Sequence, residues 1–179
     1  MFRVITNFAK TSFKKYPFVA NSVVYGTLYI TAETSQQTLY KKILSKEKQD
    51  IDVAQIGRYG VISTFCMAPM LYTWYKWLDG KFPGTAKKTV FKKLIIDQFG
   101  MTPVLLIVFF TGMSILERKP DILAECKTKF APTFATSCAF WLPMTTINFL
   151  LVPPTMRVVY VGCCTCIWSN ILCYIKSLS

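Results

Sequence analysis

Five stretches of this sequence carry no charged side chain, and each of them is at least 17 residues long. A helix that crosses a bilayer needs about 20 mostly apolar residues, within a range of roughly 17–25. One such stretch could form a buried helix in a soluble domain, but five in 179 residues leave almost no chain to cover them. The sequence therefore predicts a polytopic α-helical membrane protein whose uncharged stretches are 16–32, 59–75, 98–116, 130–156 and 158–175.

The predicted architecture is a single membrane domain, residues 1–179, of the all-α class. It is a helical bundle with four or five spans, since one of the five segments could be tilted, interfacial or re-entrant. The longest segment contains several prolines, which predict kinks in its helix. With their flanking residues included, the apolar segments lie at about 16–37, 56–78, 94–116, 130–152 and 158–175.

The first fifteen residues, MFRVITNFAKTSFKK, contain four basic residues and no acidic residue. Phe2, Ile5 and Phe13 share one helical face, and Arg3 and Lys10 lie on the other. This pattern predicts a short basic amphipathic helix at 1–15. Such a helix suits mitochondrial import and equally suits an interfacial helix that leads into the first span.

The formal net charge of +12 does not by itself indicate nucleic-acid binding. The basic residues flank apolar segments, where they can hold helix ends against anionic lipid headgroups, and no nucleic-acid-binding motif accompanies them. The lipid bilayer is therefore the expected partner, and nucleic acid is not. The Lys and Arg counts on the two sides of a five-span topology are 11 and 10, so they predict no orientation.

Catalysis and metal binding find little support in the residue types. The chain has no histidine, and six of its seven cysteines lie inside apolar segments, where thiols usually act as small packing residues. The alternatives for Cys163, Cys164 and Cys166 are a metal site, a regulatory disulfide or a lipid modification. No phosphate loop, nucleophile elbow or carboxylate dyad is visible, so the sequence predicts a non-enzyme without cofactor or metal.

A few charged and amide side chains lie at the edges of the apolar segments or within them, and these are the candidate functional residues. In one interpretation, Arg58 and Arg157 extend to the headgroups while Asp97 caps a helix or pairs with one of them. In the other, Asp97, Gln98, Asn148 and an arginine face inward, as a buried network that lines an aqueous route.

The segment WLPMTTINFLLVPPTMR, residues 141–157, places prolines and an asparagine in apolar surroundings. The amide of Asn148 must find a partner there, and interhelical hydrogen bonds of this kind contribute roughly 0.6–2 kcal/mol. Prolines free backbone carbonyls that Asn148, Thr145 or Thr146 could satisfy. We interpret the segment as a kinked helix bonded to its neighbours, with ion coordination as the alternative.

Three motifs in this order resemble the Mpv17/PMP22 family, and the resemblance extends over nearly the whole chain. They are APMLYTWYKWLDGKFPGT (68–85), KKLIIDQFGMTP (92–103) and the segment 141–157. The family pattern is matched at Pro69, Trp74, Tyr75, Leu78, Asp79, Lys93, Asp97, Gln98, Pro103, Trp141, Asn148, Phe149, Val152, Pro153, Arg157 and Trp168. The stretch GMSILERKPDI (112–122) further resembles the Mpv17-like branch.

The chain departs from the family pattern at a few polar positions. Ala68 replaces a glycine, Thr145 replaces a glutamine, and the proline expected directly after Trp141 is displaced to Pro143. Where the family has Gly-Asp at the end of the first span, this chain has Thr-Ala followed by Glu33. If these groups line a pathway, they would alter its selectivity.

The resemblance implies a small multi-span protein of the mitochondrial inner membrane, with the peroxisomal membrane as the alternative. It implies a pore or channel for ions or small metabolites that affects reactive-oxygen balance. A non-conducting scaffold, for example for the mitochondrial translation machinery, is the second hypothesis. Four or five helices make a thin wall, so a homo-oligomer and other proteins of the same membrane are candidate partners. The four tryptophans are interpreted as interface anchors and packing residues rather than a ligand cage.

Overall fold

The computed structural model describes residues 11–44 and 50–178, and all regular elements in these ranges are helical. The main helices are α2 (Pro17–Gln37), α3 (Val53–Ile62), α4 (Ala68–Lys81), α5 (Lys87–Ile96), α6 (Thr102–Leu116), α7 (Ala124–Leu151) and α8 (Arg157–Leu178). Short segments extend or join them: η1 (Thr38–Leu44), η2 (Ser63–Met67), η3 (Asp97–Met101) and η4 (Pro154–Met156). The predicted all-α class is confirmed for the described residues. Most of the amphipathic helix predicted at 1–15 lies outside them, at 1–10.

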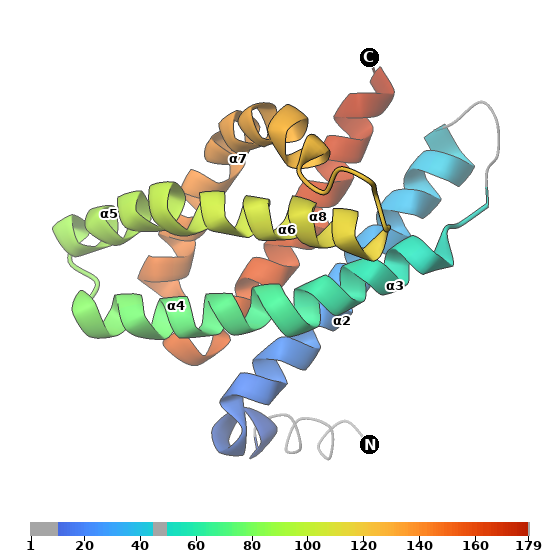
Figure 1. Cartoon of the computed structure of the whole chain (residues 1–179). Coiled ribbons are helices and arrows are strands. Elements are labelled where there is room, and N and C mark those ends of the chain that lie inside the picture. Colours follow the sequence, from blue (N-terminus) through green and yellow to red (C-terminus); the bar gives the residue numbers. More distant parts are fainter. Residues whose placement is uncertain (1–10, 45–49, 179) are drawn as a thin grey trace.

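Two long helical stretches form an antiparallel hairpin that crosses the middle of the molecule (Figure 1). The first consists of α3, η2 and α4, and the second of α5, η3 and α6. In both stretches the π-helical segment ends just before a proline. The residues before the prolines, Ala68 and Thr102, donate to carbonyls five positions earlier, and Pro69 and Pro103 then have no N–H to donate. The π-turn at Asp97–Met101 carries two of the candidate residues, Asp97 and Gln98, into buried positions.

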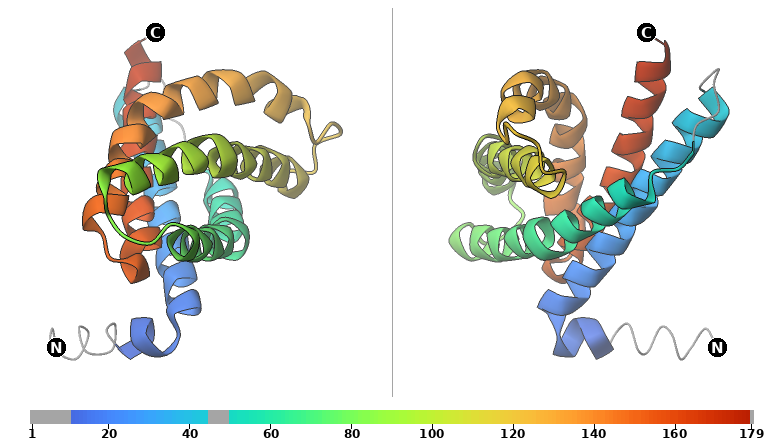
Figure 2. Two further views of the ribbon diagram at one scale, coloured as in Figure 1. Left: turned by 90° about the vertical axis from the view of Figure 1, so that its left-hand side faces the viewer. Right: turned by 45° about the vertical axis from the view of Figure 1, so that its right-hand side comes forward.

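Helix α7 bends strongly along its length, as both views in Figure 2 show. It contains Pro132 and Pro143, each of which removes a backbone hydrogen bond from the helix interior, and this is the bend that the sequence predicted. The helix stops at Leu151, because Pro153 and Pro154 cannot continue it. The chain then turns sharply into α8.

Helices α2 and α8 lie side by side and run in the same direction (Figures 1 and 2). Near the start of α2, the amide of Asn21 donates to the carbonyl of Thr155, which lies just before α8, at 3.3 Å. Near the end of α2, the amide of Asn170 in α8 donates to the hydroxyl of Ser35 at 2.7 Å. Gly162 permits this close packing, since a Cβ there would lie 2.7 Å from Cδ1 of Leu28.

Two helical stretches in the described part of the chain are long and apolar enough to cross a membrane: Lys87–Leu116, with 30 residues, and Ala124–Leu151, with 28. Only 22% of the residues in the apolar window of each are buried inside the protein, and apolar side chains such as Phe99, Val104 and Ile107 are exposed for contact with lipid. The total of four or five spans therefore stays a prediction.

Candidate functional site

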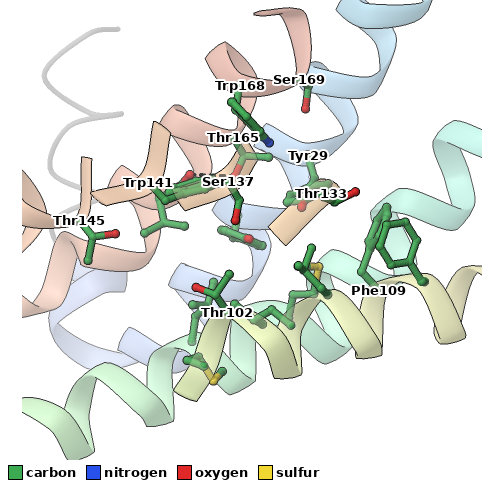
Figure 3. Close-up of a pocket in the computed structure, with 18 of the residues that line it drawn as sticks. Tyr29, Thr102, Phe109, Thr133, Ser137, Trp141, Thr145, Thr165, Trp168 and Ser169 are labelled. Atoms are coloured by element: carbon green, nitrogen blue, oxygen red, sulfur yellow. Dashed lines mark hydrogen bonds between the residues drawn. The ribbon is translucent and has the colours of Figure 1, made fainter. Parts of the chain in front are cut away.

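An internal cavity of about 330 Å³ lies between the helices of the bundle (Figure 3). Its wall is mostly apolar and includes eight aromatic side chains: Tyr25, Tyr29, Tyr59, Tyr75, Phe109, Phe110, Trp141 and Trp168. Its polar groups come from Asp97, Thr102, Thr133, Ser137, Thr145 and Thr165, and in the view of Figure 3 Thr102 lies across the space from Ser137 and Thr165. Gln36, Lys129 and Ser169 line the end at which α2 finishes and α7 begins. The arrangement is a mostly apolar chamber with a polar mouth.

Asp97 is the acidic residue in the wall of this cavity. Its side chain is 6% exposed, and Nε1 of Trp74 donates a hydrogen bond of 2.7 Å to Oδ1. Trp74 also stacks on Trp77, with ring centroids 5.1 Å apart, so the indole is held in place from both sides. Among the described residues no basic side chain lies within ion-pair distance of Asp97.

A second charged group, the Asp79 cluster (Asp79, Lys93, Phe149 and Arg157), joins α4, α5, α7 and α8. Oδ1 of Asp79 accepts from Nζ of Lys93 at 2.7 Å and also from Nη1 of Arg157. Both cations lie against the ring of Phe149, 5.7 and 5.0 Å from its centroid. Lys93 is 2% exposed and Arg157 3%, so two buried cations share one carboxylate and the cluster has a net charge of +1.

Tyr75 separates the cavity from the Asp79 cluster. Its ring lines the cavity and packs edge-on against Phe149, with centroids 5.8 Å apart. Its hydroxyl approaches the amide of Asn148, which is completely buried. Neither amide atom of Asn148 forms a well-aligned hydrogen bond, and Oδ2 of Asp79 also lacks one. Three polar atoms beyond Tyr75 are thus left without the partners that buried polar groups normally have.

The opposite end of the bundle carries an ion-pair chain (Asp52, Arg58, Glu117, Lys119, Glu125 and Lys129). Arg58 lies 3.8 Å from both Asp52 and Glu117, and Lys119 bridges Glu117 and Glu125 at 2.7 and 3.0 Å. Lys129, at the cavity mouth, pairs with Glu125 at 2.8 Å. The neighbouring Glu117 and Glu125 raise the pKa of Lys119 above its ordinary value, so this lysine stays charged at physiological pH.

The cavity and the Asp79 cluster contain half of the sixteen residues that matched the family pattern, and comparison with known proteins agrees with that pattern. The chain is 33% identical over 164 residues to the Mpv17-like protein of Xenopus laevis. The aligned region covers 92% of this chain and 79% of that protein. The chain belongs to the Mpv17/PMP22 family. The Mpv17 / PMP22 family model itself matches residues 114–173.

Two further relatives carry different names and are similar to this chain over most of its length. PXMP2/4 family protein 4 of Dictyostelium discoideum is 31% identical over 166 residues, 91% of this chain and 88% of that protein. The mitochondrial inner membrane protein Mpv17 of Mus musculus is 31% identical over 162 residues, 88% and 89% of the two chains. No solved structure matches the chain.

The structure brings the three Mpv17/PMP22 motifs together, although they are far apart in the sequence. Trp74 of the first motif bonds Asp97 of the second, and Asp79 of the first joins Lys93 of the second and Arg157 of the third. The remaining motif residues hold this arrangement. Pro69 and Pro103 open α4 and α6, Pro153 lies in the turn before α8, and Tyr75, Phe149, Trp141 and Trp168 pack around the cavity and its floor.

The single polar network considered from the sequence is divided in the structure among several places. Asp97 and Thr145 line the cavity, and Gln98 lies beside it, with Nε2 donating to Sγ of Cys138 at 3.2 Å. Asn148 is buried but does not form the interhelical hydrogen bond expected of it. Thr146 does bond a carbonyl, that of Leu142 at 2.7 Å, as expected within a proline-kinked helix.

The interpretation of the two arginines needs correction. Arg157 does not extend to the headgroups, because its side chain is buried against Asp79 and Phe149. Arg58 lies at the other end of the bundle, paired with Asp52 and Glu117. Neither arginine pairs with Asp97, since the folded helices offer each of them a nearer carboxylate.

Sequence reasoning missed the tyrosines of the cavity as site residues and noted Glu33 only as a departure from the family pattern. Glu33 is 2% exposed, and its Oε1 accepts from the amides of Gln37 and Gln55 at 2.9 and 2.8 Å. A carboxyl group at the end of an apolar segment was an available signal, because buried charges in such segments are often functional. The tyrosines had no comparable signal, since aromatic residues in apolar helices usually serve packing.

Proposed function

We propose that this chain is a mitochondrial or peroxisomal membrane protein that forms a passive pore for ions or small metabolites. Its family and the printed names of its relatives, which include a mitochondrial inner membrane protein and PXMP2/4 family proteins, support the membrane assignment. The observation that best supports a pore is the cavity, an internal space with a carboxyl group, hydroxyl groups and a polar mouth. It lies inside a bundle whose outer helices expose apolar side chains.

The proposed route enters at Lys129, Gln36 and Ser169 and follows the cavity to Tyr75. Beyond Tyr75 it would pass Asn148 and leave beside Asp79, whose side chain is 19% exposed. The unbonded atoms of Asn148 and Asp79 support this path, because buried polar groups without protein partners are normally satisfied by water. The contact between Tyr75 and Phe149 is then the closed point of the route.

Planar-bilayer recording of the purified chain tests this proposal, with one variant that fills the cavity and one that does not. Ser137 lines the cavity, and its neighbour Thr136 is exposed on the outside of the same helix. We expect Ser137→Phe to lower the unit conductance, because the ring would occupy the route, and Thr136→Phe to leave it unchanged. Thermal melting in detergent would establish that both variants are folded.

Two results would contradict the pore. Folded wild-type protein that stays electrically silent would exclude conduction by this chain and favour the scaffold function. Equal conductance of the two variants would show that solutes do not pass through this cavity.

A further inference from the structure

The carboxylate of Asp97 lacks a positively charged partner among the described residues. Burying an ionised carboxylate away from water is unfavourable unless a cation or several hydrogen bonds compensate for it. Trp74 supplies one hydrogen bond to Oδ1. Lys93, four residues earlier, would be the natural partner on the same helix, but its Nζ is bonded to Asp79 at 2.7 Å.

The cavity that Asp97 lines also contains several aromatic side chains. Tyr25, Tyr29 and Tyr59 form a row, with successive ring centroids 5.3 and 6.5 Å apart, and Tyr75 continues the lining toward the floor. A positive charge within about 6 Å of such a ring face is attracted by the ring, and the attraction is stronger when the charge is removed from water. Aromatic rings combined with one carboxylate are the usual surroundings of an alkylammonium group.

The other charges near the cavity reinforce this preference. Lys129 at the mouth is paired with Glu125, so its charge is already compensated. Glu33 is buried outside the cavity wall, and its Oε1 accepts hydrogen bonds from the amides of Gln37 and Gln55. The carboxylate that lines the cavity, that of Asp97, therefore has no charged partner among the described residues.

We propose that the cavity binds a small organic ammonium ion, with its charge beside Asp97 and its alkyl groups against the tyrosine rings. The described residues contain no group of three or more Cys, Asp and Glu side chains that could hold a metal ion, which disfavours a divalent cation. The apolar share of the wall favours an organic cation over a small hydrated one. The volume of about 330 Å³ falls at the lower end of the roughly 300–1,000 Å³ found for small-molecule sites.

This inference rests on the proposed function in that it names the solute class for the same cavity, but binding can be measured without conduction. Isothermal titration calorimetry on the full chain in detergent would compare choline with its neutral isostere, in which carbon replaces the ammonium nitrogen. The two probes have the same shape, so a difference reports the charge. We expect choline to bind at least about tenfold more tightly, as a desolvated cation–π and carboxylate site implies.

The matched variants are Asp97→Asn and Asp121→Asn. Asparagine at 97 keeps an oxygen for Trp74 and removes the charge, so the preference for choline should disappear. Asp121 is exposed in the loop before α7 and caps the N–H of Leu123, which asparagine can also do, so its replacement should leave binding unchanged. Tyr29→Leu should weaken choline binding but not the binding of the isostere, and it serves if Asp97→Asn does not fold.

Equal binding of the two probes to the wild type, or binding of neither, would overturn the inference. Retained preference in Asp97→Asn would also overturn it. Choline binding by a chain that is electrically silent in bilayers would refute the pore and support the ammonium site. Conductance without choline binding would support the pore and refute the ammonium site.

Discussion

The Asp79 cluster allows a prediction about the order of stabilities in three variants. Asp79 is the one carboxylate between two cations that are each at most 3% exposed. In Asp79→Asn the two cations keep their positions and lose their counter-charge. Removing one partner of a buried ion pair costs about 3–5 kcal/mol, and two like charges about 4 Å apart repel by roughly 4 kcal/mol at an effective dielectric constant near 20. We expect Asp79→Asn to lower the free energy of unfolding by at least about 3 kcal/mol.

Lys93→Met should behave very differently, although it removes a buried charge from the same cluster. Methionine has a similar length, and its introduction leaves Asp79 paired one-to-one with Arg157. Replacing a buried ion by an apolar side chain of similar volume is often neutral, so we expect a change within about 1 kcal/mol. The double variant Asp79→Asn, Lys93→Met should be more stable than Asp79→Asn alone, because only one uncompensated cation remains.

The assay is equilibrium unfolding of the purified chain in detergent micelles, followed by tryptophan fluorescence. Lys92→Met is the matched control, because Lys92 is exposed beside Lys93 and should change stability by less than about 0.5 kcal/mol. Equal destabilisation by Asp79→Asn and Lys93→Met would refute the reasoning. Simple addition of the two effects in the double variant would refute it too, since the argument requires the second substitution to relieve the first.

Three further substitutions test the packing of the bundle and the support of the cavity. In Gly26→Ala the new Cβ would overlap Oγ1 of Thr64, so we expect a loss of about 1–3 kcal/mol in thermal or denaturant unfolding. In Gly57→Ala the new Cβ would have no atom within 4 Å, so this substitution should stabilise the protein by up to about 1 kcal/mol through helix propensity. An equal loss of stability in Gly26→Ala and Gly57→Ala would contradict the packing argument. Trp74→Phe removes the hydrogen bond to Asp97 and should cost about 1.5–3 kcal/mol, and unchanged stability would show that the bond contributes nothing.

The sequence alone predicted those features that depend on residues close together in the chain. Uncharged stretches of helical length predicted the all-α class, and the prolines predicted where helices bend or begin, because a missing N–H acts within one turn. The ordered motifs predicted the family. Inward-facing positions for Asp97 and Gln98 were one of two interpretations of the sequence, and the burial of both side chains is a finding of the structure.

Only the tertiary structure decided which charged groups meet. Lys93 and Asp97 are spaced as an ordinary pair along one helix, yet Lys93 bonds Asp79, 14 residues away, and Arg157 reaches the same oxygen from 78 residues away. Asp97 is left facing a cavity whose tyrosines come from α2, α3 and α4. The physical reason is that spacing along a helix sets the face of each side chain, whereas its partner depends on how neighbouring helices cross, and those crossings result from the packing of the whole bundle.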